Sequence, residues 1–184
     1  IIKKKKCYVI KNDNDFSLLK KVNIRNVEYS SAKFILAMSI KPTLNIERFK
    51  PLLNKFLKKK IPMLCINPDK YVYDGKVRKF VYQVGKLAEY YEKKGGRVLY
   101  IGKPYKEIFA YAFSRIKIKK SKILMIGDSL NTDIAGANNF KIKSALVMDG
   151  FNKSEKKIFP RSSISKITKK LRIKPNYLIK NIAL

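Results

Sequence analysis

Two aspartates that are five residues apart stand where an α/β protein binds its ligands. Gly127 and Asp128 directly follow the apolar run 123–126, and Asp133 falls in the first turn of the helix that we expect next. Open α/β sheets bind ligands at the carboxyl ends of their strands. Two carboxylates at such an end suit a hard cation, because Mg²⁺ commonly takes one or two protein carboxylates together with phosphate oxygens. The alternative is that Asp133 caps its helix and Asp128 belongs to a turn.

A lysine lies 25 residues before Asp128, between two residues that bend the chain. Lys103 stands between Gly102 and Pro104, directly after the apolar run 98–101. Phosphoryl transfer needs fixed positive charge against the oxygens of the transferred group, and a lysine at a strand exit can supply it. The other interpretation is an ordinary surface lysine, of which this chain has many.

Apolar runs alternate with amphipathic segments along the chain, which indicates strands that alternate with helices. We expect strands over residues 7–10, 33–38, 63–66, 98–101, 123–126 and 144–148, and a last apolar stretch over 177–179. We expect helices over residues 16–22, 45–60, 81–94, 105–116, 132–140 and 162–171. Pro51 lies inside the second helix and predicts a kink or a late start there. The alternation predicts an α/β fold with parallel strand pairing.

Length and composition limit the class of protein. The 184 residues are 46% hydrophobic, which is enough to bury a core. No apolar run approaches the roughly 20 residues of a membrane helix, and no secretory leader is visible. Two cysteines and no histidine exclude a disulfide framework and a Cys/His zinc site. We therefore expect a cytoplasmic protein without a membrane segment.

The net charge raises the question of a nucleic-acid partner. The chain has 43 Lys and Arg against 13 Asp and Glu, a formal charge of +30. Lysines that cluster can neutralise phosphates and give salt-sensitive binding. Here they are spread from Lys3 to Lys180, which favours compositional drift with lysine as the default surface residue. We expect loose, non-specific adhesion to polyanions such as nucleic acid.

The sequence from Gly127 to Ala137 resembles the last motif of the haloacid dehalogenase (HAD) superfamily of hydrolases. Gly102-Lys103-Pro104 resembles the lysine motif of its class IIA branch, which includes the 4-nitrophenyl and pyridoxal phosphatases, and Asn67-Pro68-Asp69 and Gly95-Gly96 also stand where that branch has them. The resemblance implies a Rossmann-like HAD core, of which residues 98–184 are the C-terminal part, and an α/β cap domain over residues 1–97.

The resemblance also implies roles for particular residues. Lys103 would hold the nucleophile and the transferring phosphoryl group, and Asp128 would be a ligand of Mg²⁺. Asp133 would be the second acid, which positions the metal site through Lys103 or water. The loop that follows Asn67 and Asp69 would face a small phosphorylated substrate, although a plain turn explains these two residues equally well.

The family's nucleophile is missing from its expected place. Family members carry Asp-x-Asp-Gly directly after the first strand, because attack by a carboxylate forms the phosphoaspartyl intermediate. The nearest pair here is Asp13 and Asp15, which come after two intervening polar residues and read better as a turn and helix cap. Ser39 follows an apolar run and imitates the phosphate-binding Ser/Thr motif, but in the class IIA order it falls inside the cap.

We therefore expect the chain to represent the cap and the second half of the core, inactive alone for want of a nucleophile. A start at Ile1 rather than Met agrees with this expectation. A separate amino-terminal half, or a second copy, would then be a partner, since the strand over residues 123–126 would otherwise have an open apolar edge. The alternative function is a non-catalytic remnant or binding module with affinity for polyanions.

Overall fold

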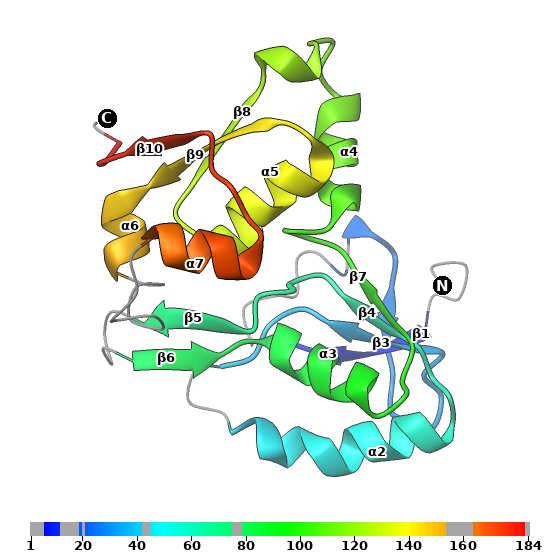
Figure 1. Cartoon of the computed structure of the whole chain (residues 1–184). Helices are drawn as coiled ribbons and strands as arrows, with labels where there is room; N and C mark the ends of the chain where they lie inside the picture. The colour runs from blue at the N-terminus through cyan, green and yellow to red at the C-terminus, as the bar shows by residue number, and fades with distance from the viewer. Residues whose placement is uncertain are drawn as a thin grey trace. The chain divides into compact units, whose positions relative to one another are not determined.

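A computed structural model describes residues 6–11, 19, 21–41, 45–74, 79–153 and 164–182 of the chain. The chain divides into two compact units, residues 1–101 and 102–184, and Figure 1 shows the elements of both. Each unit has a parallel sheet with helices, so the predicted α/β fold is confirmed. Among the described residues, no helix has the length and apolar character needed to cross a membrane.

The first unit is built on a five-stranded parallel sheet with the order β2-β1-β3-β4-β7. Its strands are β1 (Lys6–Ile10), β2 (Arg25–Asn26), β3 (Phe34–Ala37), β4 (Met63–Cys65) and β7 (Val98–Tyr100). All residues of β3 and β4 are buried. Ile35 and Ala37 of β3 face one hydrophobic cluster, and Phe34 and Leu36 face another. A parallel sheet covered on both faces has such continuous apolar strands, which is why the sequence pattern located them.

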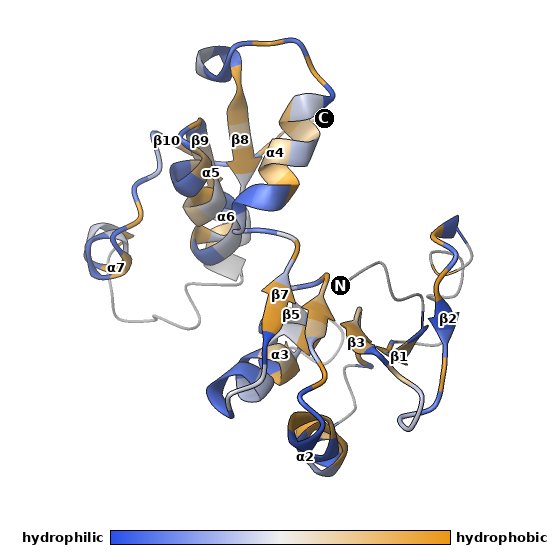
Figure 2. Ribbon diagram, turned by 90° about the vertical axis from the view of Figure 1, so that its right-hand side faces the viewer, coloured by the Kyte–Doolittle hydropathy of each residue, from blue (hydrophilic) through white to orange (hydrophobic). Residues whose placement is uncertain are grey.

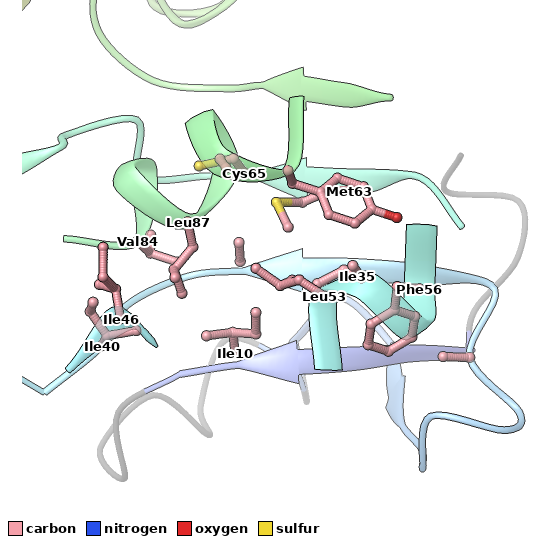
Figure 3. Packing of buried hydrophobic residues seen from close by; sticks show 14 residues of the cluster. Ile10, Ile35, Ile40, Ile46, Leu53, Phe56, Met63, Cys65, Val84 and Leu87 are labelled. Carbon is pink, nitrogen blue, oxygen red and sulfur yellow. The ribbon is translucent and has the colours of Figure 1, made fainter. Parts of the chain in front are cut away.

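Two helices cover one face of this sheet: α2 (Lys50–Lys58) and α3 (Val84–Lys93). Figure 3 shows Leu53 and Phe56 of α2 and Leu87 of α3 packed over the strands. Asn45 caps a short 3₁₀ turn, η1 (Ile46–Phe49), by accepting a hydrogen bond from the backbone of Glu47. The α-helix then starts at Lys50 with Pro51 in its first turn. Of the two alternatives that Pro51 predicted, a kink or a late start, the structure shows the late start.

A two-stranded antiparallel hairpin, which the sequence pattern missed, precedes α3. It consists of β5 (Tyr71–Asp74) and β6 (Lys79–Tyr82). The predicted helix over residues 81–94 is therefore wrong at its start, because residues 81 and 82 belong to β6 and the helix begins at Val84. The helix ends before Gly95, whose φ of +86° suits a residue without a side chain. The predicted helix over residues 16–22 lies mostly outside the described residues.

The second unit has a three-stranded parallel sheet with the order β10-β9-β8. The strands are β8 (Leu124–Gly127), β9 (Lys143–Val147) and β10 (Tyr177–Ile179). Its helical elements are α4 (Lys106–Ser114), η2 (Lys120–Lys122), η3 (Leu130–Ile134), α5 (Ala135–Phe140), α6 (Met148–Lys153) and α7 (Ile164–Leu171). A small core joins η3, β9, α6 and α7, formed by Leu130, Ile134, Leu146, Phe151 and Ile167.

Two local predictions in this unit need correction. We expected a strand over residues 144–148, but β9 covers Lys143–Val147, and Met148 is the first residue of α6. The predicted helix over residues 132–140 starts two residues earlier, as the π-helical turn η3 that leads into α5. Short helices of five or six residues give the sequence too little periodicity to reveal them.

Candidate active site

Strand β8 places Asp128 at the carboxyl end of the second unit's sheet. β8 pairs in parallel with β9, with Gly127 opposite Leu146. Asp128 is the first residue after the strand, and the turn η3 begins two residues later, at Leu130. This is the position at which open α/β sheets bind ligands, so the predicted location of Asp128 is the observed one.

Asp133 is one of two buried polar residues among those described, with 4% of its surface exposed. Its Oδ1 accepts a hydrogen bond from the Lys103 Nζ at 2.5 Å, and its Oδ2 accepts one from the Ser129 backbone N–H at 3.2 Å. Burial of a carboxylate is costly unless such charged and polar donors satisfy its oxygens. The capping interpretation of Asp133 is thus partly right, since it binds the first turn's backbone, but the ion pair with Lys103 goes beyond it.

Close packing at the end of β8 depends on Gly127. A Cβ at this residue would lie 2.3 Å from the carboxylate of Asp133, far below any real contact distance. Gly127 therefore leaves the space into which the Asp133 side chain folds back. The π-helical turn η3 brings Asp133 to this space from the other side.

Lys103 reaches the site from the loop that enters α4. Gly102, with a φ of +132°, turns the chain directly before it. Asn139 of α5 donates to the carbonyl of Pro104 at 3.4 Å, which ties this loop to the second unit. The Lys103 side chain is 46% exposed, whereas that of Asp133 is 6% exposed. The ammonium group thus has one buried partner and an open side.

Lys103, Asp128 and Asp133, which the sequence singled out, all belong to the second unit, and two of them are in contact. No group of three or more His, Cys, Asp or Glu side chains able to hold a metal ion occurs among the described residues. Mg²⁺ is usually held by one or two protein carboxylates, with waters and substrate phosphate completing its shell. Lys103 already binds the carboxylate of Asp133. The chemistry of Asp128 therefore fits that of a single carboxylate ligand.

Asn67 and Asp69 belong to the first unit, in the connection between β4 and the hairpin. The Asn67 Oδ1 accepts a hydrogen bond from the Asp69 backbone N–H at 3.3 Å, and the Asp69 carbonyl accepts one from the Gly85 N–H at 3.1 Å. The Cys65 thiol donates to the carbonyl of Asn67. These contacts support a backbone role for the turn, and a role in binding substrate stays a prediction.

The other candidates lie elsewhere. Asp13 and Asp15 are outside the described residues. Ser39 follows β3 in the first unit, where its backbone N–H donates to the carbonyl of Ile10. Sequence reasoning passed over Ser129, whose backbone holds Asp133, although its place directly after Asp128 marks it as part of the same turn.

Models of two protein families match the chain. A model described as haloacid dehalogenase-like hydrolase matches residues 37–141, and one described as HAD-hydrolase-like matches residues 100–183. The first match covers more than half of the chain and includes all three second-unit candidates. None of the curated proteins matches.

Solved structures share the fold over most of the chain. A haloacid dehalogenase-like hydrolase from Brucella suis is 26% identical, with a TM-score of 0.69 over 78% of this chain and 57% of that one. The p-nitrophenyl phosphatase from Archaeoglobus fulgidus is 17% identical and has a TM-score of 0.72; the match covers 96% of this chain and 64% of that one. NagD from E. coli is 20% identical and has a TM-score of 0.68; the match covers 96% of this chain and 64% of NagD. The chain therefore spans 57–64% of the length of these structures, and it shares their fold.

Proposed function

The chain belongs to the haloacid dehalogenase-like hydrolase family, and we propose that it supplies the lysine and metal-ligand half of a site that hydrolyses small organic phosphates with Mg²⁺. The observation that carries this proposal is the ion pair between Lys103 and Asp133, formed next to Asp128 at the carboxyl end of β8. A fixed ammonium group beside a carboxylate ligand is the arrangement that phosphoryl transfer requires.

Each of these side chains has one task in the proposed reaction. Lys103 turns its open side to the equatorial oxygens of the phosphoryl group and stabilises the charge that they carry in the transition state. Asp133 holds the ammonium group in place through their ion pair. Asp128 would hold Mg²⁺, which when bound neutralises phosphate charge.

The attacking carboxylate comes, in this proposal, from outside the second unit. The 184 residues contain no Asp-x-Asp-Gly after an apolar run, and a carboxylate nucleophile is needed to form the aspartyl-phosphate intermediate. Among the described residues, β8 pairs only with β9 and is an edge strand. Its side chains Leu124 and Ile126 are 44% and 46% exposed, and Figure 2 shows the apolar colour of β8.

An apolar edge strand of this kind accepts another strand. We propose that an amino-terminal HAD half pairs with β8 and brings its nucleophile next to Lys103 and Asp128. The first unit is then the cap, with Asn67 and Asp69 as candidates for contact with a small phosphorylated metabolite. A second copy of the chain is the other partner that could cover the edge.

Hydrolysis of p-nitrophenyl phosphate with Mg²⁺ tests the proposal. The folded chain alone should be inactive, and a separately expressed amino-terminal segment that carries Asp-x-Asp-Gly after an apolar strand should restore activity. Asp128→Asn should abolish the restored activity. Activity of the chain alone that is lost in both Asp13→Asn and Asp128→Asn would show a complete site and contradict the need for a partner.

The charge of +30 supports a second candidate function, a non-catalytic module that binds polyanions. Such binding weakens steeply with salt, because each neutralised phosphate releases counterions. Affinity for single-stranded DNA measured between 50 and 300 mM KCl, together with no activity in the complemented assay, would favour this alternative.

A further inference from the structure

Gly150 lies against the side chain of Asp128. The two residues follow neighbouring strands: Asp128 comes directly after β8, and Gly150 is the third residue of α6, which follows β9. A Cβ built on Gly150 would lie 2.4 Å from the Asp128 Oδ2, 2.5 Å from its Cβ and 2.8 Å from its Cγ. Any side chain at residue 150 would therefore displace the whole Asp128 side chain.

The lack of space for a side chain, rather than the backbone conformation, explains why residue 150 is a glycine. The φ of Gly150 does not lie in the left-handed region, where glycine is favoured. In a helix, glycine is less favourable than alanine. Helical preference alone would thus select alanine at this position, and the contact with Asp128 is what excludes it.

The residues on both sides of Gly150 fix its backbone. Phe151 is 1% exposed and packs in the second unit's core with Leu146 and Ile167. The Asp149 backbone N–H donates to the carbonyl of Lys180 at 3.0 Å. Because the segment is held by these two contacts, it cannot retreat from an added methyl group, and the strain falls on Asp128.

We propose that Gly150 is a positioning residue that sets the orientation of the Asp128 carboxylate. The Asp128 carboxylate occupies the space that a side chain at residue 150 would need, just as the Asp133 carboxylate occupies the space beside Gly127. Gly150, which follows β9, thereby determines the orientation of Asp128, which follows β8. The inference rests on the proposed function in one respect, namely that Asp128 is a metal ligand.

A double-mutant cycle with two readouts tests it. The first readout is the urea midpoint of Gly150→Ala in the wild-type and the Asp128→Gly backgrounds. With Asp128 present, alanine should lower the midpoint. Without the Asp128 side chain, it should leave the midpoint unchanged or raise it, because only helical preference remains. An equal decrease in both backgrounds would overturn the proposal.

The second readout is Mn²⁺ affinity, measured by calorimetry on the full chain. Gly150→Ala should weaken binding at least tenfold. The matched control is Gly96→Ala in the first unit, whose Cβ would meet the ring of Tyr91 at 2.3 Å; it should lower the urea midpoint without this loss of affinity. Equal affinity of Gly150→Ala and wild type would overturn the inference. A wild-type chain that binds Mn²⁺ no better than Asp128→Asn would contradict the proposed metal site, and the urea cycle would still decide the role of Gly150.

Discussion

Lys103 and Asp133 form an ion pair with 2.5 Å between Nζ and Oδ1, although 30 residues separate them in the chain. The pair is asymmetric, because the Asp133 side chain is buried and the Lys103 side chain is nearly half exposed. An ammonium group has three donors. It can therefore keep its bond to Asp133 while it binds a second anion, which a fully buried pair could not do.

Breaking this pair should cost stability. Lys103→Met leaves the Asp133 carboxylate buried without its counter-charge, and we expect a loss of about 2 kcal/mol in the free energy of unfolding. Asp133→Asn should have a smaller effect because the amide is neutral. Urea unfolding of both variants and of the double variant gives the coupling between them. Strictly additive effects would mean that the contact contributes nothing to stability.

Asp128→Asn should separate activity from stability. In the complemented enzyme we expect a decrease of at least a hundredfold in kcat/KM, because the variant loses the charge that holds Mg²⁺. The urea midpoint should change little. Glu107→Gln, which removes an acidic side chain from the first turn of α4, is the control and should keep wild-type kinetics. A parallel loss in the control would point to net charge rather than to a metal site.

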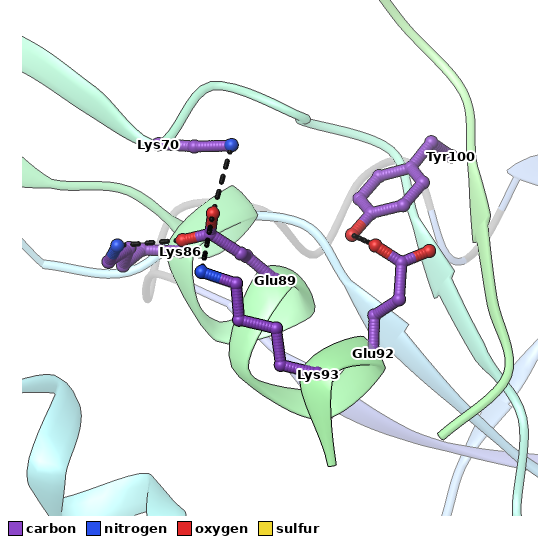
Figure 4. A network of polar contacts seen from close by, with 6 residues as sticks. All are labelled: Lys70, Lys86, Glu89, Glu92, Lys93 and Tyr100. Atoms are coloured by element: carbon purple, nitrogen blue, oxygen red, sulfur yellow. Dashed lines mark hydrogen bonds and ion pairs between the residues drawn. The ribbon is translucent and has the colours of Figure 1, made fainter. Parts of the chain in front are cut away.

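Glu89 should make the stability of the first unit depend on pH. Hydrogen bonds from Lys86, and then from Lys70 and Lys93, outweigh partial burial and lower the pKa of Glu89 to about 2; Figure 4 shows the three lysines around the carboxylate. A carboxylate with a lowered pKa stabilises the fold above its unfolded pKa near 4.5. This contribution is lost as the pH falls from about 4.5 towards 2.

Glu89→Gln measures that contribution. At pH 7 the variant should be less stable by roughly 1–2 kcal/mol, a range reduced for the exposure of the lysines. The difference from wild type should shrink at pH 3. Glu92→Gln is the matched control on the same helix, where the carboxylate accepts a hydrogen bond from Tyr100 at 3.2 Å. A Glu89→Gln deficit that is independent of pH would refute the linkage.

The two cysteines should be inert in the folded chain. Both side chains are fully buried, and burial raises the pKa of Cys7 to about 11 and that of Cys65 to about 12. The thiolate is the reactive form, so little of it exists at pH 8. Ellman's reagent should label both thiols in urea and neither within minutes in buffer. Rapid labelling of one thiol in buffer would show that its strand opens locally.

The sequence revealed four of the five strands of the first sheet because they contain continuous apolar runs, as in β3 and β4, which are fully buried. It missed β2, whose two residues, Arg25 and Asn26, are polar and exposed. The hairpin of β5 and β6 escaped prediction because its apolar runs, Tyr71-Val72-Tyr73 and Phe80-Val81-Tyr82, are only three residues long. The second run also leads almost directly into the helical pattern that starts at Val84.

The sequence also placed Lys103, Asp128 and Asp133 at strand ends, because glycines and apolar runs mark those ends locally. It could not reveal the contact between Asp128 and Gly150. That contact depends on how β8 pairs with β9 and on a helix, α6, of only six residues, and both are properties of the tertiary structure.

The edge of β8 should make the isolated chain associate. Leu124 and Ile126 of this edge strand are nearly half exposed, and unpaired strand groups flanked by apolar side chains pair readily with another chain. Sedimentation of the wild type should show association that increases with concentration. Ile126→Lys should reduce it, since a lysine on an edge strand opposes pairing. Ile118→Lys, at an equally exposed isoleucine outside the strands, should not. A wild type that stays a monomer at 100 µM would contradict the prediction that this exposed edge drives association.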